Sequence, residues 1–117
     1  MAEGWMRYVD VKWLHACPVE PIRLVSEIGP DCYETRKIEF WSDGRVGDAS
    51  QDGASPSTCL GDQPVPTLEE SNSKVEFGGV EIDASAFERL WQQYVTARLS
   101  DGPAKWGYRR HRPWGVL

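Results

Sequence analysis

The feature that most constrains the fold is a change of hydrophobic period along the chain. Residues 7–14, RYVDVKWL, alternate strictly, with Val9, Val11 and Trp13 on one face of an extended segment. Residues 85–99 instead place apolar side chains three or four positions apart, as a helix requires. A chain that changes once from strand spacing to helix spacing predicts an α+β fold in which strands come first and a helix comes last.

Extended segments separated by turn residues predict an antiparallel arrangement of the strands. After residues 7–14, further strands are predicted at residues 22–28, 33–41, 45–49 and 75–82. Asp43-Gly44 lies where a tight hairpin turn favours residues that tolerate positive φ, and Gly78-Gly79 weakens the last strand and places it at an edge. The predicted architecture is therefore an antiparallel β-meander of three to five strands.

The helix is predicted at residues 85–99 from its start signal and its apolar stripe. Ser85 and Glu88 have the spacing of a capping box, and a shorter helical turn is expected at residues 64–70. We expect the stripe to pack across one face of the sheet and to belong, with Trp13, to the core. The stripe consists of Phe87, Leu90, Trp91, Tyr94, Val95 and Leu99.

Charge divides the chain into a body and a tail. A length of 117 residues suits one domain, which we place at residues 1–104, followed by a tail at residues 105–117. The body holds 18 acidic and nine basic residues, whereas the tail holds four basic residues, no acidic residue and three interleaved aromatic side chains. The acidic body argues against nucleic-acid binding, because phosphate contacts need clustered Lys and Arg. The tail could dock on the body or be disordered, contact a partner, or bind nucleic acid; the first is favoured.

Neither a membrane span nor a secretory route is predicted. No run approaches the roughly 20 apolar residues of a membrane helix, and the opening MAEGWMRYVD lacks the apolar stretch of a signal peptide. Cytoplasmic residence is the expectation. Cys17, Cys32 and Cys59 are an odd number at unequal spacing, which predicts reduced thiols instead of a disulfide framework.

The templates of common catalytic and metal sites do not fit this sequence. Counted from Asp43, Arg45 and Gly47 occupy positions where a calcium loop needs oxygen ligands. His15 and Cys17 lack a second ligand pair at zinc-finger spacing, and neither a glycine-rich phosphate loop nor a nucleophile elbow is present. We therefore expect no enzyme activity, no cofactor and no metal.

A set of short motifs resembles a family of small bacterial domains of unknown function. The motifs fall between about Met6 and about Gln93, and they are Tyr8-x-x-Val11-x-Trp13-x-His15, Glu20-Pro21, Glu27, Arg36-Lys37-x-Glu39, Asp43-Gly44, Pro64-x-Pro66-x-x-Glu69-Glu70 and Phe87-x-x-x-Trp91. The resemblance implies a compact bacterial cytosolic α+β domain and carries over no catalytic residue. Small acidic single-domain proteins of this kind are similar to the immunity proteins that neutralise toxins from rival cells.

The leading functional hypothesis is a non-enzymatic protein-binding domain, an immunity protein or antitoxin-like inhibitor. We expect an acidic face to cover a basic surface of a cognate partner such as a toxin, because opposite potentials speed encounter. The aspartates that follow the predicted hairpin could equally form a solvated surface. The predicted partner-binding residues are Trp41, as an apolar anchor, and the acids Asp43, Asp48, Asp52, Asp62, Glu69 and Glu70.

The alternative hypothesis is a small enzyme or ligand-binding domain. Its pocket would lie near His15 and would use Arg36 and Glu39. Because Arg36 and Glu39 are three positions apart, they fall on opposite faces of an ideal strand, which weakens this alternative. A deep pocket that holds His15 beside a charged partner would favour it over the inhibitor.

Overall fold

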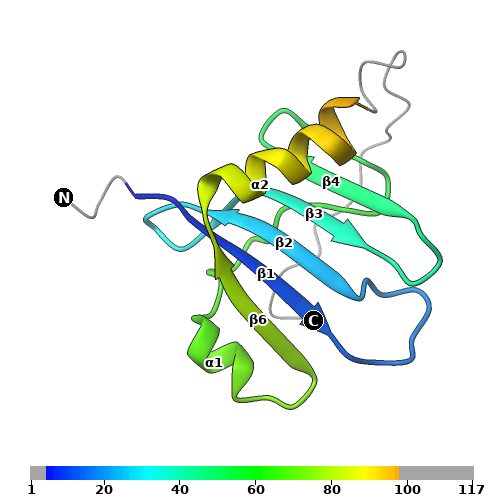
Figure 1. Ribbon diagram of the computed structural model, residues 1–117, viewed down its shortest axis with the longest axis vertical. Helices are drawn as coiled ribbons and strands as arrows, with labels where there is room; N and C mark the ends of the chain where they lie inside the picture. Colours follow the sequence, from blue (N-terminus) through cyan, green and yellow to red (C-terminus); the bar gives the residue numbers. More distant parts are fainter. Residues whose placement is uncertain (1–4, 98–117) are drawn as a thin grey trace.

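The computed structural model describes residues 5–97, which form one antiparallel sheet of six strands with two helices and a terminal π-helical turn (Figure 1). The strands are β1 (Arg7–Trp13), β2 (Arg23–Ile28), β3 (Glu34–Phe40), β4 (Val46–Ser50), β5 (Gly53–Ala54) and β6 (Phe77–Ile82). Their order in the sheet is β5-β4-β3-β2-β1-β6. The fold is therefore mostly β, and the predictions for residues 98–117 lie outside the described residues.

The sheet has more strands than the three to five predicted. β1 to β5 form a meander, but β6 returns to the far side of β1, where Phe77 pairs with Trp13 and Ile82 with Tyr8. The additional strand is β5, whose two residues pair with the end of β4. A strand of two residues shows no hydrophobic alternation, so its pattern in the sequence is indistinguishable from that of a loop.

The helices begin at side chains that accept hydrogen bonds from exposed backbone amides. α1 (Leu68–Asn72) begins after Thr67, which forms a reciprocal capping box with Glu70. α2 (Ala84–Trp91) continues into a π-helical turn, η1 (Gln92–Thr96). The predicted capping box of Ser85 and Glu88 is wrong: Asp83 is the N-cap, and its carboxylate accepts hydrogen bonds from the Ala86 amide at 2.8 Å and the Ser85 hydroxyl at 2.9 Å.

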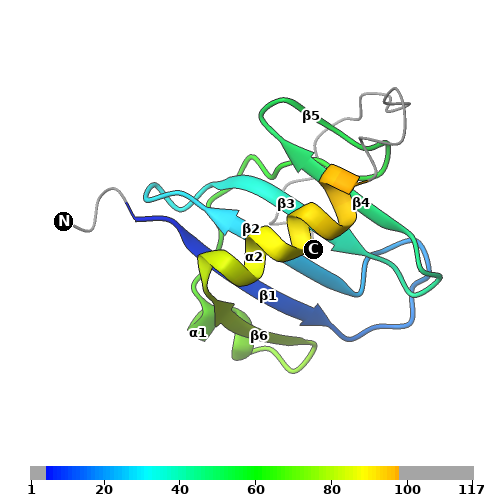
Figure 2. The same cartoon turned by 45° about the horizontal axis from the view of Figure 1, so that its top comes forward.

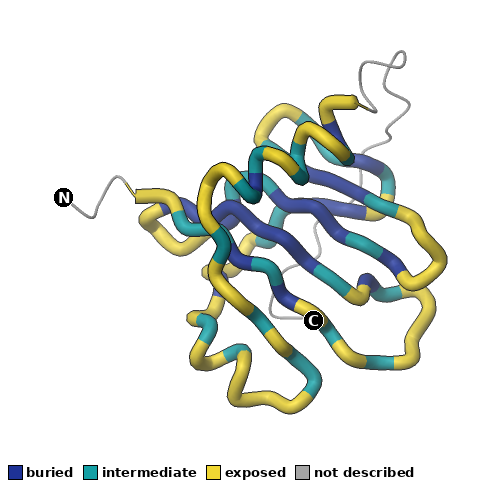
Figure 3. The backbone as a smooth tube through the Cα atoms, viewed as in Figure 1, coloured by how far each residue is buried: buried dark blue, intermediate teal, exposed yellow. Residues whose placement is uncertain are grey.

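Both faces of the sheet contribute to the core. On the face toward α2, Val25 and Ile38 pack with Phe87 and Val95 of α2 and η1. On the other face, Val9, Val11, Leu24 and Ile28 pack with Val65, next to Leu68 of α1. Figures 1 and 2 show α2 lying across the sheet and α1 beside β6, and Figure 3 shows that the central strands are the most buried.

Two glycines of the β3–β4 hairpin have defined structural roles. Gly44 has a φ of 93°, which fits the predicted turn because a residue without Cβ adopts it at no steric cost. At Gly47 on β4, a Cβ atom would lie 2.1 Å from Oγ1 of Thr58. The segment after β5 therefore lies directly against the bare backbone of β4.

Candidate functional site

The acids that follow the β3–β4 hairpin do not form one surface. Asp43 is exposed in the turn before β4, where its carboxylate accepts hydrogen bonds from the backbone amide of Arg45 at 3.0 Å and from the Arg45 side chain at 2.9 Å. The pKa of Asp43 is lowered, first by the backbone hydrogen bond from Arg45. Asp52 is exposed in the turn after β4, at the opposite end of that strand. The hairpin prediction is thus met, but Asp43 and Asp52 are separated by the length of β4.

Two predicted contact residues lie in the interior. Trp41, the predicted anchor, is 4% exposed, and its indole nitrogen donates a hydrogen bond to the carbonyl of Val19 at 3.2 Å. The Arg45 guanidinium covers the ring, with its central carbon 5.0 Å from the ring centroid. Asp48 is 6% exposed on β4. Neither side chain is presented to a partner in this conformation, because both are buried.

The remaining predicted acids belong to an acidic segment that the sequence analysis only partly recognised. We call residues 61–83, which contain α1 and β6, the α1–β6 edge. The segment begins beside β3, where the Gly61 amide donates to Glu34, and reaches β6 only through α1. It holds six acids and a single basic residue, Lys74. The acids are Asp62, Glu69, Glu70, Glu76, Glu81 and Asp83. Figure 3 shows this edge mostly exposed, in contrast to the buried strands beside it.

The exposed acids of the α1–β6 edge accompany exposed apolar side chains. Val75 is 93% exposed and Val80 is 60% exposed. Among residues 5–97, none of the six acids forms a salt bridge with a basic residue. Glu70 and Asp83 cap helices, so the charges with no structural partner here are those of the other four acids.

α1 also protects the backbone of the edge strand β6. The amide nitrogen of Asn72 donates to the carbonyl of Gly79 at 3.0 Å, and its oxygen accepts from the Gly79 amide at 2.7 Å. These two bonds reproduce the pairing that another strand would make with β6. Asn72 therefore blocks the pairing of another strand with β6 at Gly79. A partner at the α1–β6 edge would contact side chains instead of the backbone of β6.

A second group of charges is completely enclosed. We call Glu34, Lys37 and Glu39 of β3 the buried triad; their side chains are at most 2% exposed. The Lys37 ammonium lies 3.1 Å from Oε1 of Glu34 and 3.7 Å from Oε2 of Glu39, and it donates to the carbonyl of Cys59 at 3.0 Å. Burying such a charge costs on the order of several kcal/mol per ion unless the charge is paired.

Backbone and hydroxyl groups satisfy the carboxylates of the buried triad. Glu34 accepts from the Gly61 amide at 2.8 Å and from the Ser26 hydroxyl at 3.1 Å, and Glu39 accepts from the Thr58 hydroxyl at 3.1 Å. Burial raises the pKa of Glu34, against the lowering effect of Lys37. The triad therefore fixes residues 58–61 to β3, which is a structural role. Its signal in the sequence was the opposite charges of Lys37 and Glu39 at strand spacing.

A third charge cluster lies on the face toward α2. The Arg36 guanidinium binds Glu27, with one nitrogen–oxygen distance of 2.8 Å and another of 2.7 Å, and it also forms a salt bridge with Glu88 of α2. Its central carbon lies 4.8 Å from the Phe87 ring centroid and 4.9 Å from that of Trp91. The hydrogen bond with Glu27 is the largest cause that raises the pKa of Arg36, and the same bond lowers that of Glu27. This cluster connects α2 to the sheet.

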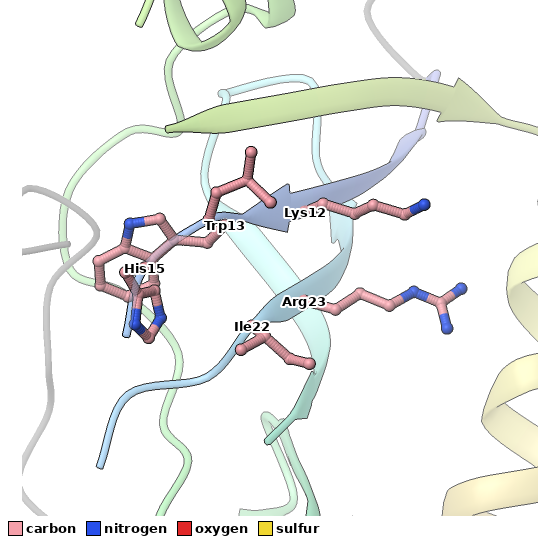
Figure 4. Close-up of a pocket in the computed structure, with 6 residues that line it drawn as sticks. Lys12, Trp13, His15, Ile22 and Arg23 are labelled. Atoms are coloured by element: carbon pink, nitrogen blue, oxygen red, sulfur yellow. The ribbon is translucent and has the colours of Figure 1, made fainter. Parts of the chain in front are cut away.

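An open groove of about 420 Å³ lies beside His15, where β1 ends and β2 begins (Figure 4). It is lined by Lys12, Trp13, Leu14, His15, Ile22 and Arg23. Both ring nitrogens of His15 have backbone partners: Nε2 lies 2.7 Å from the carbonyl of Pro21, and Nδ1 accepts from the Cys17 amide at 3.0 Å. Both ring nitrogens are therefore already engaged by the backbone.

The residues of the enzyme hypothesis are not assembled into one site. Arg36 bonds with Glu27 on the α2 face, whereas Glu39 bonds with Thr58 on the opposite face, as the strand alternation predicted. In residues 5–97, no group of three or more His, Cys, Asp or Glu residues could hold a metal ion. The three cysteines are free thiols, with Cys59 buried and the other two exposed. No helix in this range has the length and apolar character of a membrane span.

A family model described as "Domain of unknown function (DUF6881)" matches residues 7–96. The chain belongs to this family. The match spans the whole sheet together with α1, α2 and η1, and it corresponds closely to the range in which the motifs of the sequence resembled such a family. Comparisons with curated proteins and with solved structures give no match.

Proposed function

We propose that this family member is a non-enzymatic protein-binding domain that acts as an immunity-type inhibitor of a basic protein, a toxin in the leading form of the proposal. The observation that supports it is the α1–β6 edge, where six acids and one lysine occupy 23 consecutive residues. The charges of the buried triad and of the Arg36 cluster are used inside the fold. The edge is the longest acidic segment whose charges form no salt bridge among residues 5–97, and it is therefore the surface proposed to meet a basic partner.

The mechanism of the proposed inhibitor is occlusion. Negative potential at the α1–β6 edge accelerates the approach of a positively charged surface. Val75 and Val80 then supply apolar contact at the same edge, and the rigid sheet behind β6 lets binding proceed with little loss of conformational entropy. The immunity type further implies that the domain acts in the cytoplasm of a bacterial cell, on a partner encoded beside it.

Isothermal titration of the purified protein with the product of the adjacent gene tests this proposal. We expect one-to-one association whose affinity falls as the salt concentration rises, because screening weakens attraction between exposed charges. The proposal is rejected if the neighbouring product does not bind, or if binding is insensitive to salt. A parallel assay of the neighbour's toxic activity should show inhibition at equimolar protein, and retained activity in the complex would contradict occlusion.

A further inference from the structure

The groove beside His15 has a pair of cations at one side. Lys12 and Arg23 are direct cross-strand partners of β1 and β2, and Figure 4 shows their side chains extending in the same direction. Like charges placed directly opposite each other destabilise a strand pair. Asp10 forms a salt bridge with Arg23 but not with Lys12.

Arg23 uses both oxygens of Asp10. Its Nε donates to Oδ1 at 2.9 Å and one terminal nitrogen donates to Oδ2 at 2.7 Å. The Phe40 ring further fixes the guanidinium, whose central carbon lies 4.7 Å from the ring centroid. Lys12 is exposed and forms no salt bridge with any acid among residues 5–97. One positive charge at the groove thus has no counter-charge in the described part of the protein.

The rest of the groove offers an apolar surface held by aromatic packing. The Trp13 ring stacks on Phe77 at a centroid distance of 5.7 Å and packs edge-on with the His15 ring at 4.3 Å. Leu14 is 66% exposed and Ile22 is 37% exposed beside these rings. A volume of about 420 Å³ falls within the range of small-molecule sites, which combine apolar walls with a few polar groups.

We propose that this groove binds a small amphipathic anion. The apolar body of the ligand, aromatic or aliphatic, lies against Leu14 and Ile22, and its single carboxylate, sulfonate or phosphate group pairs with Lys12. Because backbone groups already contact both ring nitrogens of His15, the proposed role of the site is to bind its ligand. The inference uses none of the acids of the α1–β6 edge, so it holds or fails separately from the proposed function.

Titration with the fluorescent anion anilinonaphthalene sulfonate tests the site. We expect saturable binding with one site per chain, weakened about fivefold by Lys12→Met, since this is the size of one exposed charge interaction. Leu14→Asp should abolish binding, because it places a negative charge on the apolar wall. Lys74→Met, which removes an equally exposed lysine from the α1–β6 edge, should bind as the parent protein does. Lys12 and Leu14 are both exposed, so their replacement leaves the core unchanged.

Competition experiments and NMR mapping distinguish binding at this site from nonspecific binding of the probe. Decanoate should displace the probe, whereas decylammonium, with the same apolar body and the opposite charge, should not. In NMR spectra, the methyl signals of Leu14 and Ile22 should shift on addition of the probe. The proposal is overturned if Lys12→Met binds like the parent protein, if the two competitors act equally, or if the shifts fall on Val75 and Val80 instead.

Discussion

Charged residues of the sheet interior and charged residues of the α1–β6 edge have opposite relations to the rest of the molecule. Inside, Lys37 contacts two carboxylates and a carbonyl, and Arg36 binds two carboxylates and packs against two aromatic rings. At the edge, none of the six acids forms a salt bridge with another residue in the range 5–97. Interior charge therefore determines how the chain holds together, and edge charge determines what it can attract.

The two interior clusters also differ from each other, although Arg36 and Lys37 are neighbours in the sequence. Arg36 lies on the half-exposed α2 face, where a planar guanidinium can bind two acids and stack on rings. Lys37 points to the opposite face and is enclosed with both of its acids. The enclosed cluster should be the more sensitive to mutation, because an unpaired charge there has no access to water.

The largest loss of stability is expected for Lys37→Met. The substitution keeps the apolar stem but leaves Glu34 and Glu39 buried together without a cation, which should lower the free energy of unfolding by about 3–5 kcal/mol. Urea denaturation followed by tryptophan fluorescence measures this. Lys74→Met at the exposed edge is the matched control and should stay within about 0.5 kcal/mol of the parent protein. Equal effects of the two substitutions would contradict the structural role of the buried triad.

The buried triad should also produce a pH dependence through Glu34. Burial raises the folded-state pKa of Glu34 above its usual value of 4.5, so the folded protein binds this proton more tightly than the unfolded chain does. The resulting stability is complete below the unfolded-state pKa and is lost as the pH rises through the folded-state value.

Glu34→Gln removes this contribution to the pH dependence. Above the usual pKa of 4.5, the plot of unfolding free energy against pH should fall less steeply in Glu34→Gln, by up to about 1.4 kcal/mol per pH unit where Glu34 titrates. Urea denaturation at a series of pH values provides the measurement. Glu69→Gln, at an exposed position, should leave the slope of the parent protein unchanged; the same slope in all three proteins would rule out a titrating Glu34.

A smaller effect is expected for Arg36→Lys. Lysine keeps the charge but cannot contact Glu27 through two nitrogens or lay a planar guanidinium against the Phe87 and Trp91 rings, which should cost about 1–2 kcal/mol. Thermal unfolding by circular dichroism should show the loss. Hydrogen exchange should show weaker protection in α2 than in β2, because the substitution loosens the contact of α2 with the sheet. Unchanged protection of α2 would show that its apolar stripe alone holds it in place.

The smallest effect on stability is expected for neutralisation of the edge. The triple variant Asp62→Asn, Glu69→Gln and Glu81→Gln removes three exposed charges that have no salt-bridge partner among residues 5–97. Its unfolding free energy should stay within about 0.5 kcal/mol of the parent value for each substitution, because such surface changes are nearly neutral. Chemical denaturation tests this, and a strong destabilisation would mean that the edge acids are structural after all.

Most of the fold could be predicted from the sequence, because its strands and its hairpin turn have local sequence patterns. Alternation identified β1 to β4 and β6, and Asp43-Gly44 identified the hairpin turn. The pairing of β6 with β1 was not predicted, since register between distant strands leaves no local pattern. The N-cap was misplaced because Asp83 and Ser85 are both residue types that cap helices well, and only the geometry shows that the Asp83 carboxylate accepts from the Ala86 amide.

The candidate site was less predictable than the fold. Asp43, Asp48 and Asp52 are close in the sequence, but the hairpin separates Asp43 from Asp52 and directs Asp48 inward. Conversely, α1 and β6 bring Glu69 and Glu81 onto one edge from positions twelve residues apart. Which acids lie close together on the surface depends on tertiary packing, and a count of charges along the sequence gives no information about that packing.

The most direct test is the affinity of the adjacent gene's product for two variants of equal charge. One is the edge triple variant; the other, Asp31→Asn, Asp43→Asn and Asp52→Asn, neutralises three exposed acids outside the edge. Titration calorimetry at low and high salt should show the edge variant bound about tenfold or more weakly with a reduced salt dependence, and the other bound like the parent protein. Equal weakening of both variants, or a greater loss in the second, would contradict recognition through the α1–β6 edge.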